Sequence, residues 1–374
     1  MKQSAITLLT FLLLFFTILV NKSYSNSREK NNIVQLAILL DTSNSMDGLI
    51  DQAKNQLWKI VNELARANKD GEDISLKVAL YEYGNDNLSV TSGYIRQVVP
   101  LTTDLDKISA ELFKLRTNGG SEYCGNVISN AVKELEWSED PDQLKIIFIA
   151  GNEPFTQGNI DYRIAAREAV LKGIIVNTIY CGDYNEGVQT MWKDGAVLAN
   201  GEYMNIDQDE RIVHIPTPYD DDLILLGQQL NDTYIPYGAF GNKYKTRQEE
   251  QDKNASNMAP EVLVERNITK SSGQYRNDSW DLVDAKKEGK VKIDELKEDE
   301  LPDVMKNMSV EERTAYVEKM KKEREEIQTQ INQLNEKRRK FIDNKLAENQ
   351  DNTLDAAMIR MIREQAVKKN YTFK

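Results

Sequence analysis

Three stretches of the chain are almost unbroken runs of apolar residues. They cover residues 34–40 (VQLAILL), 144–150 (LKIIFIA) and 174–180 (IIVNTIY). Runs that lack the alternation of a half-exposed strand are typical of strands buried on both faces of a parallel sheet. We therefore expect these segments to form the centre of a sheet.

Amphipathic segments separate these runs. After the first run, apolar residues such as Leu49, Ala53, Leu57 and Ile60 recur at spacings of three and four, which is typical of a helix. The same reasoning predicts helices over 49–64, 105–115, 127–137, 162–171 and 188–198, and further strands over 76–83, 94–101 and 203–206. Strands that alternate with helices predict an α/β fold with a doubly wound, mostly parallel sheet. Ligands of such sheets bind outside the carboxyl ends of the strands.

The composition changes after residue 232. Residues 233–308 are polar and rich in turn formers, which predicts a polar linker or irregular region. Residues 309–374 predict a mainly helical, coiled-coil-like region that opens with a capping box of Ser309 and Glu312. Its seam contains Val317, Met320, Arg324, Ile327, Ile331, Leu334, Arg338 and Phe341.

The apolar seam of this long helix needs a partner. Either residues 354–366 pack back on it as a hairpin through a turn near 349–352, or a second chain forms a coiled-coil dimer. Arg324 and Arg338 would each bury a charge in a long dimer, which favours the hairpin. An oligomer through these C-terminal helices is the alternative.

The first 25 residues have the features of a signal peptide. Lys2 precedes an apolar run over residues 5–20, and the small residues Ser23 and Ser25 precede a candidate cleavage point. The alternative is an uncleaved membrane anchor. The run is shorter than a membrane span requires, so we expect cleavage and no stable span afterwards. The sequence therefore predicts a secreted or periplasmic protein.

Composition and charge narrow the classes of partner and chemistry. The 374 residues carry 48 basic and 60 acidic side chains, a net charge of −12, which disfavours nucleic acid as a partner. The lone His214 leaves little room for triad chemistry, and we expect it to be structural. Cys124 and Cys181 form either one disulfide or two buried thiols.

One motif carries candidate chemistry. Asp41, Ser43 and Ser45 form a D-x-S-x-S pattern directly after the first buried run and before the first long helix. Alternate residues of an extended loop point the same way, so one carboxylate and two hydroxyls can converge. Hard oxygen ligands of this kind suit Mg²⁺, or Ca²⁺ and Mn²⁺. The alternative is that Asp and Ser are ordinary turn and capping residues here.

The segment LAILLDTSNSMDGLIDQAK resembles the opening of a von Willebrand factor type A (VWA) domain with its metal-ion-dependent adhesion site. The motif Gly119-Gly120-Ser121-Glu122 resembles the family's second metal loop, and WKDGAVLANGEYMN resembles its closing helix and last short strand. The resemblance implies a six-stranded, mostly parallel sheet flanked by helices, a VWA domain with a C-terminal extension over residues 33–232, and metal bound at the carboxyl edge. The segment AGNEPFTQG after the expected fourth strand also resembles a bacterial extracytoplasmic subset of the family.

The sequence departs from the family pattern at two metal-binding positions. Gly151 stands where the family has an Asp at the end of its fourth strand, with Asn152 and Glu153 following it. In the second loop, Ser121 and Glu122 replace the usual Thr or Asp, and Thr117 is a further candidate. The expected metal ligands are Asp41, Ser43, Ser45, Ser121, Glu122 and Glu153.

These features predict a non-enzymatic, extracytoplasmic binding module. A divalent cation would bind a carboxylate offered by a protein partner, as the family resemblance implies. A metal-assisted hydrolase is the first alternative, with Glu122, Glu153 or Asp47 as its general base. A structural envelope scaffold with a vestigial metal site is the second.

Overall fold

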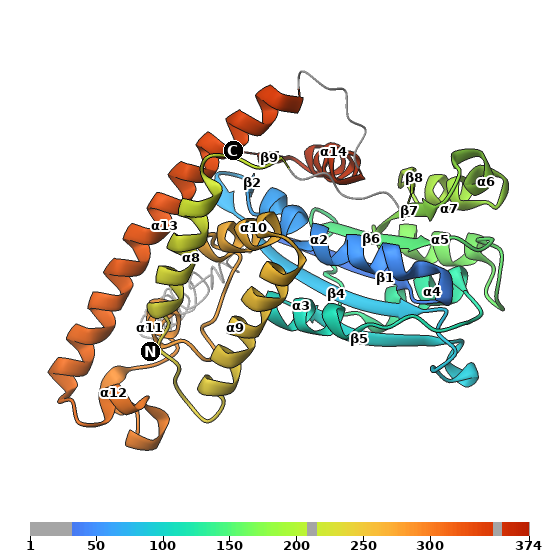
Figure 1. Ribbon diagram of the computed structural model, residues 1–374. Helices are drawn as coiled ribbons and strands as arrows, with labels where there is room; N and C mark the ends of the chain where they lie inside the picture. Colours follow the sequence, from blue (N-terminus) through green and yellow to red (C-terminus); the bar gives the residue numbers. More distant parts are fainter. Residues whose placement is uncertain (1–31, 208–214, 347–353, 374) are drawn as a thin grey trace, which may run out of the picture. The chain divides into compact units, whose positions relative to one another are not determined.

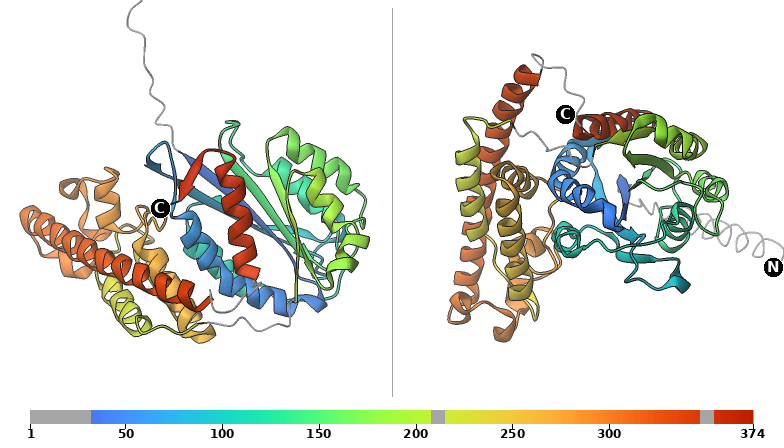
Figure 2. Two further views of the ribbon diagram at one scale, coloured as in Figure 1. Left: turned by 90° about the horizontal axis from the view of Figure 1, so that it is seen from above. Right: turned by 45° about the vertical axis from the view of Figure 1, so that its right-hand side comes forward.

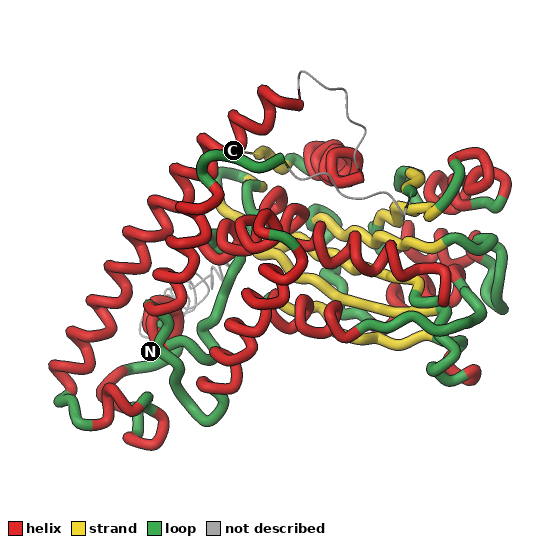
Figure 3. The backbone as a smooth tube through the Cα atoms, viewed as in Figure 1, coloured by secondary structure: helices red, strands yellow, loops and turns green. Residues whose placement is uncertain are grey.

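The computed structural model of this protein describes residues 32–207, 215–346 and 354–373. The chain from Asn32 onward forms one compact unit. A central sheet carries helices on both faces, and a second group of helices packs beside it (Figures 1 and 3). The predicted signal peptide, His214 and the turn near 349–352 lie outside the described residues.

The central sheet has six strands in the order β5-β4-β1-β6-β7-β8. Neighbouring strands are parallel, except that β5 pairs antiparallel with β4 at the edge. The expected doubly wound, mostly parallel sheet is therefore confirmed. Its strands are β1 (Ile33–Asp41), β4 (Ser75–Tyr83), β5 (Ile95–Thr102), β6 (Leu144–Gly151), β7 (Ile175–Cys181) and β8 (Tyr203–Ile206).

Helices cover both faces of this sheet (Figure 2). Apolar residues of α2 (Asp47–Leu64) and α3 (Leu105–Lys114) pack on one face. Those of α4 (Cys124–Glu134), α5 (Tyr162–Leu171) and α7 (Trp192–Leu198) pack on the other. The central strands are apolar along their whole length because a layer of helices covers each face of the sheet.

The predicted helix over residues 188–198 is two helices. The short α6 (Tyr184–Gln189) ends before Met191, whose φ of 73° is left-handed, and α7 begins at Trp192. A non-glycine residue in that region cannot continue a right-handed helix, so the chain turns there.

The expectation of an irregular linker over residues 233–308 is wrong. After α8 (Asp220–Asp232), the chain forms α9 (Gly241–Met258), α10 (Pro260–Ser271), α11 (Leu282–Lys287) and α12 (Asp303–Lys306). Pro260 occupies the first turn of α10, where its missing N–H costs nothing. These helices surround two apolar clusters of their own, one centred on Leu223, Leu230 and Trp280 and the other on Leu282 and Met305.

The predicted long helix is present as α13 (Val310–Leu346), with the capping box that the sequence indicates. The Ser309 hydroxyl accepts from the Glu312 backbone N–H at 3.2 Å, and the Ser309 backbone N–H donates to the Glu312 carboxylate at 2.8 Å. The apolar seam packs on α8, α10 and α11. The seam is therefore covered within the chain.

The predicted hairpin between α13 and the last helix is wrong. Helix α14 (Leu354–Val367) packs on α2 and buries Met358, Met361 and Ile362 in the sheet's own core. After α14 comes β9 (Tyr371–Phe373), which pairs antiparallel with β2 (Ala67–Lys69) in a small sheet with β3 (Glu72–Asp73).

The two arginines on the α13 seam bury their charges against acidic residues. Arg324 contacts Asp281 and Asp284, and Arg338 contacts Asp220 and Glu265.

None of the described helices is long and apolar enough to cross a membrane.

Candidate metal-binding site

The D-x-S-x-S residues lie where the sequence places them, at the carboxyl edge of the central strand. Asp41 is the last residue of β1, opposite Tyr83 of β4, and the adjacent Leu40 is opposite Ala150 of β6. The Asp41 carboxylate accepts from the Ser43 backbone N–H at 2.7 Å, and the Ser43 and Ser45 hydroxyls are 3.3 Å apart. Asp41 is fully buried, whereas Ser45 is exposed. The motif thus runs from a fixed carboxylate to an open surface.

Glu122 brings a second carboxyl group to Asp41. It comes from the loop before α4 and is only 4% exposed. A Cβ placed on Gly84 would lie 2.7 Å from Glu122 Cγ and 2.8 Å from Asp41 Oδ1, so both side chains crowd around this glycine. The φ of Gly84 is +76°, a conformation that favours glycine. The loop geometry thus leaves room for two acidic groups and no other side chain.

Burial and mutual repulsion make this pair hard to ionise. Loss of solvation raises the pKa of Asp41 to about 6. Loss of solvation and the nearby Asp41 charge raise the pKa of Glu122 to about 9. Two carboxyl groups in one dry site therefore share a proton at neutral pH unless a cation joins them.

The residues present fit a divalent cation. Asp41 Oδ2 and Glu122 Oε2 are buried, and neither has a hydrogen-bond partner among the described residues. Buried carboxylate oxygens without a partner are costly, and a bound cation would satisfy both. Within the described part of the chain, no three His, Cys, Asp or Glu side chains gather as a metal cluster. The donor set here is instead two carboxylates with the hydroxyls of Ser43 and Ser45, all hard oxygens suited to Mg²⁺.

The structure explains why Gly151 occupies the family's Asp position. A Cβ at Gly151 would lie 2.5 Å from the Tyr83 hydroxyl and 3.0 Å from Asp41 Oδ2. The Tyr83 hydroxyl fills this space and donates to the Ala150 carbonyl at 2.9 Å. Tyr83 and Gly151 therefore exclude a fourth-strand carboxylate, and Glu122 supplies one from the second loop. No signal in the sequence pointed to Tyr83, because its reach depends on the packing of β4, β1 and β6.

The two residues after Gly151 have different contacts. The Asn152 side-chain amide donates to the Ser45 hydroxyl at 3.1 Å, which ties the end of β6 to the motif. The Glu153 carboxylate accepts from the Gln157 side chain at 3.0 Å. Glu153 is near enough to act electrostatically on both Asp41 and Glu122. Asn152 is thus the fourth-strand residue in contact with the motif, and Glu153 lies in the surroundings of the acidic pair.

The remaining candidates of the second loop lie around the pair. Ser121 is half-buried and immediately precedes Glu122. The Thr117 hydroxyl donates to the Asp47 carboxylate at the start of α2. The contacts of the described residues bring Asp41, Ser43, Ser45, Glu122 and Asn152 together, whereas Thr117 is engaged with Asp47.

Both cysteines are free and buried at this end of the sheet. The Cys124 thiol lies 3.9 Å from the Tyr83 hydroxyl. Burial raises the pKa of both thiols, which keeps them protonated. Of the two alternatives left open by the sequence, the structure has buried thiols.

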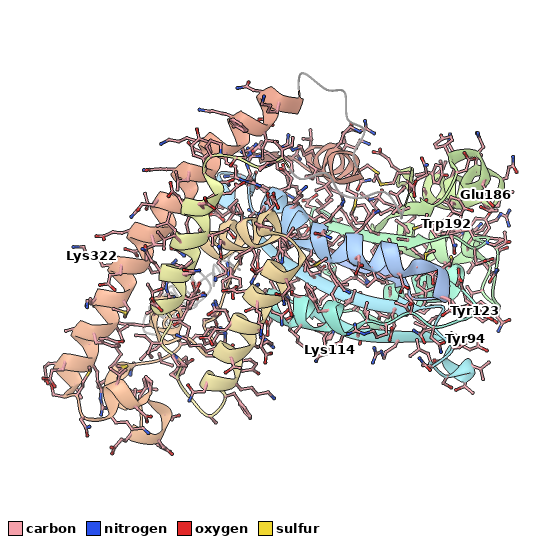
Figure 4. The ribbon with its side chains drawn as sticks, in the orientation of Figure 1. Tyr94, Lys114, Tyr123, Glu186, Trp192 and Lys322 are labelled. Atoms are coloured by element: carbon pink, nitrogen blue, oxygen red, sulfur yellow. The ribbon has the colours of Figure 1, made fainter. Side chains whose placement is uncertain are left out.

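Aromatic side chains stand near the site at the same end of the sheet (Figure 4). Tyr94 and Tyr123 make an edge-to-face pair with ring centroids 5.9 Å apart. The buried Trp192 donates its indole N–H to the Glu153 carbonyl at 2.8 Å, which fixes the loop after β6. These contacts hold the loops around the acidic pair.

The sequence over residues 35–208 matches the von Willebrand factor type A domain family. Together with the six-stranded sheet and the D-x-S-x-S loop at its carboxyl edge, this match identifies the first part of the chain as a VWA domain. Domains of this class are generally interaction modules. No curated protein matches the chain.

Solved structures with similarity to the chain include other VWA proteins. The conserved hypothetical protein BatB from Bacteroides thetaiotaomicron is 20% identical, with 46% of this chain and 90% of that chain covered and a TM-score of 0.35. The SpRpn10 VWA domain is 16% identical, with 48% and 90% covered and a TM-score of 0.36. An aerotolerance-related membrane protein from Bacteroides fragilis is 19% identical, with 46% and 92% covered and a TM-score of 0.31. At such scores these similarities carry no information about function.

Proposed function

We propose that this protein is a non-enzymatic, extracytoplasmic binding module that captures a carboxylate of a protein partner through a divalent cation. The observation that carries the proposal is the pair of buried, unpartnered oxygens on Asp41 and Glu122, beside two serine hydroxyls at an open sheet edge. An ion held there would offer a Lewis-acidic position to an incoming carboxylate.

Different residues of the chain would bind the cation from different sides. Asp41 and Glu122 would bind the cation from the buried side, and Ser43 and Ser45 would bind it from the loop. The Ser43 backbone N–H fixes the Asp41 carboxylate, and Asn152 holds Ser45 in place. Ser121 and Glu153 remain candidates for completing the shell, Glu153 through its negative charge near the pair.

Calorimetric titration of the purified protein with Mg²⁺ and Mn²⁺ tests the metal site. We expect one site in the wild type and a loss of affinity of more than tenfold in Asp41→Asn, because the buried carboxylate is a direct ligand. Asp183→Asn is the matched control. It lies after β7 at the same sheet edge, and asparagine can replace it as the N-cap of α6. Unchanged binding in Asp41→Asn would refute the site.

Capture of partners from the native envelope tests the function. A specific partner should bind the wild type in Mg²⁺ and be lost both with EDTA and in Asp41→Asn. Equal capture under all three conditions would favour the scaffold alternative. Turnover of phosphate esters that disappears in Asp41→Asn would favour the hydrolase.

A further inference from the structure

Three arginines line one cleft near the C-terminal end of α2, the opposite end from the sheet edge described above. Arg66 follows the C-terminus of α2, Arg339 lies on α13 and Arg363 lies on α14. Glu63, whose side chain is 9% exposed, receives Arg363 Nε at 2.5 Å and Arg66 Nη1 at 3.5 Å. Two guanidinium groups thus share a single buried carboxylate.

The third arginine leaves the group with surplus positive charge. No hydrogen bond or ion pair joins the half-buried Arg339 guanidinium to any residue that the structure describes. Its charge nonetheless reaches Arg66, since burial first and then repulsion from Arg339 lower the pKa of Arg66. Asp343, the other acidic residue that acts on Arg363, is exposed and therefore screened by solvent.

The adjacent residue on α13 shows what a purely structural arginine is like in this protein. Arg338 is buried and binds two carboxylates, Asp220 at 2.9 Å and Glu265 at 2.7 Å. Arg339 has neither partner. Joining α2 to α14 requires only Arg363 and Glu63, so a third guanidinium adds repulsion without adding a structural bond.

The three arginines line one cleft of about 1320 Å³, which is bordered among the described residues by parts of α2, α10, α13 and α14. Other charged residues also line this cleft. The acidic ones are the exposed Asp73, Glu336, Asp343 and Glu364, the half-buried Glu261, and Glu265, which is engaged by Arg338; the basic ones include Lys59, Lys340 and Arg360. A cleft of this size admits a ligand larger than an inorganic ion.

We infer that this cleft binds a ligand bearing a phosphate or sulfate group, held by Arg66, Arg339 and Arg363. Guanidinium groups are planar, always charged, and bind such oxyanions through paired N–H donors. An oxyanion would supply the negative charge that Glu63 alone cannot. This site is independent of the cation site.

Calorimetric titration of the full chain with inorganic phosphate and, separately, with sulfate tests the inference. EDTA is present throughout, so that no ion at the cation site contributes. We expect saturable binding of at least one of the two ions, and the stronger one indicates the natural group. Arg339→Gln should weaken it at least tenfold, and because Arg339 makes no bond within the described chain, this change should leave the fold intact by circular dichroism.

Two further variants complete the test. One should raise the affinity for the ion, and the other is a matched control that should leave it unchanged. Glu63→Gln should bind the ion more tightly, because it removes the competing carboxylate. Lys337→Gln removes an exposed charge of α13 that does not line the cleft, and this variant should bind as the wild type does. Absence of saturable binding, an Arg339→Gln variant that binds normally, or equal losses in Arg339→Gln and Lys337→Gln would each overturn the inference.

Discussion

Two buried groups of acidic residues in this protein have opposite surroundings. At the sheet edge, Asp41 and Glu122 face each other without a cation from the chain, and burial raises the pKa of both. At the junction between the VWA domain and the C-terminal helices, Asp106 of α3 and Asp252 of α9 surround the buried Arg266 of α10.

The junction satisfies its charges completely. Arg266 contacts Asp106 at 2.7 Å and Asp252 at 2.5 Å, Lys270 contacts Asp252 at 2.8 Å, and Tyr275 donates to Asp106 at 2.6 Å. Burial alone would raise the pKa of Asp252, but Lys270 and Arg266 hold it well below its usual range. Ion pairs of this kind fix one arrangement of the packed helices.

The difference separates a structural use of buried charge from the functional use that we propose for Asp41 and Glu122. Where carboxylates hold the fold together, the chain supplies its own cations. At Asp41 and Glu122 it supplies glycines and hydroxyls instead, and leaves two carboxylate oxygens without partners. The second arrangement keeps a proton at neutral pH unless a cation from outside replaces it, as the proposed metal-dependent site would require.

The largest expected effect comes from breaking the junction. Arg266→Met leaves Asp106 and Asp252 buried without their main cation, and should lower the free energy of unfolding by about 3–5 kcal/mol. Urea denaturation measures this, with the exposed Arg276→Met as the control. A loss no greater than in the control would show that the junction is as dispensable as a surface charge.

A smaller effect should follow from Gly151→Asp. The new Cβ would overlap the Tyr83 hydroxyl, so we expect a loss of about 1–3 kcal/mol of stability in excess Mg²⁺. Adding Tyr83→Phe removes that hydroxyl and should recover part of the loss. Gly273→Asp, at a position with open space around it, is the control. Equal stability of Gly151→Asp and the control would mean that Tyr83 does not exclude a fourth-strand side chain.

The smallest effect, taken per pH unit and per proton, is the pH dependence of stability in EDTA. A carboxyl group with a raised pKa keeps a proton that the unfolded chain has already lost, so stability should fall as pH rises. The fall should begin above about pH 4, where unfolded carboxyls ionise. It should continue through the values of about 6 for Asp41 and about 9 for Glu122. Its slope is at most about 1.4 kcal/mol per pH unit for each proton.

Two comparisons sharpen this pH measurement. Glu122→Gln should flatten the curve between pH 6 and 9, and saturating Mg²⁺ should flatten it in the wild type. Asp183→Asn should leave it unchanged. A wild-type curve that is flat in EDTA would show that the pair is not held apart from solvent as the structure indicates.

Local sequence patterns were enough to predict several parts of this protein. The apolar run over 34–40 required a strand buried on both faces, and the D-x-S-x-S motif after it could only lie at that strand's carboxyl end. Ser309 and Glu312 fixed the start of α13 through contacts three residues apart. Each of these features is set by residues close together in the chain.

The tertiary structure decided the features that depend on distant partners. Helix α9 has few apolar residues and was expected to be irregular, yet it is held by polar contacts: Arg247 with Asp104, Gln251 with Ser109, and Asp252 with Arg266. Asp104 and Ser109 lie 143 and 142 residues away in sequence, so no local window contains the main reason for this helix.

The same limit applies to α14 and to the site. From its sequence, the apolar face of α14 could pack on α13 or on α2. In the structure, other helices already cover the seam of α13, so α14 packs on α2 and the sheet core. At the site, the sequence predicted the Asp41 loop and named Glu122 as a candidate. That Tyr83 occupies the place of a fourth-strand carboxylate followed only from the packing of three strands, because a side chain's reach across a sheet is set by its neighbours in space.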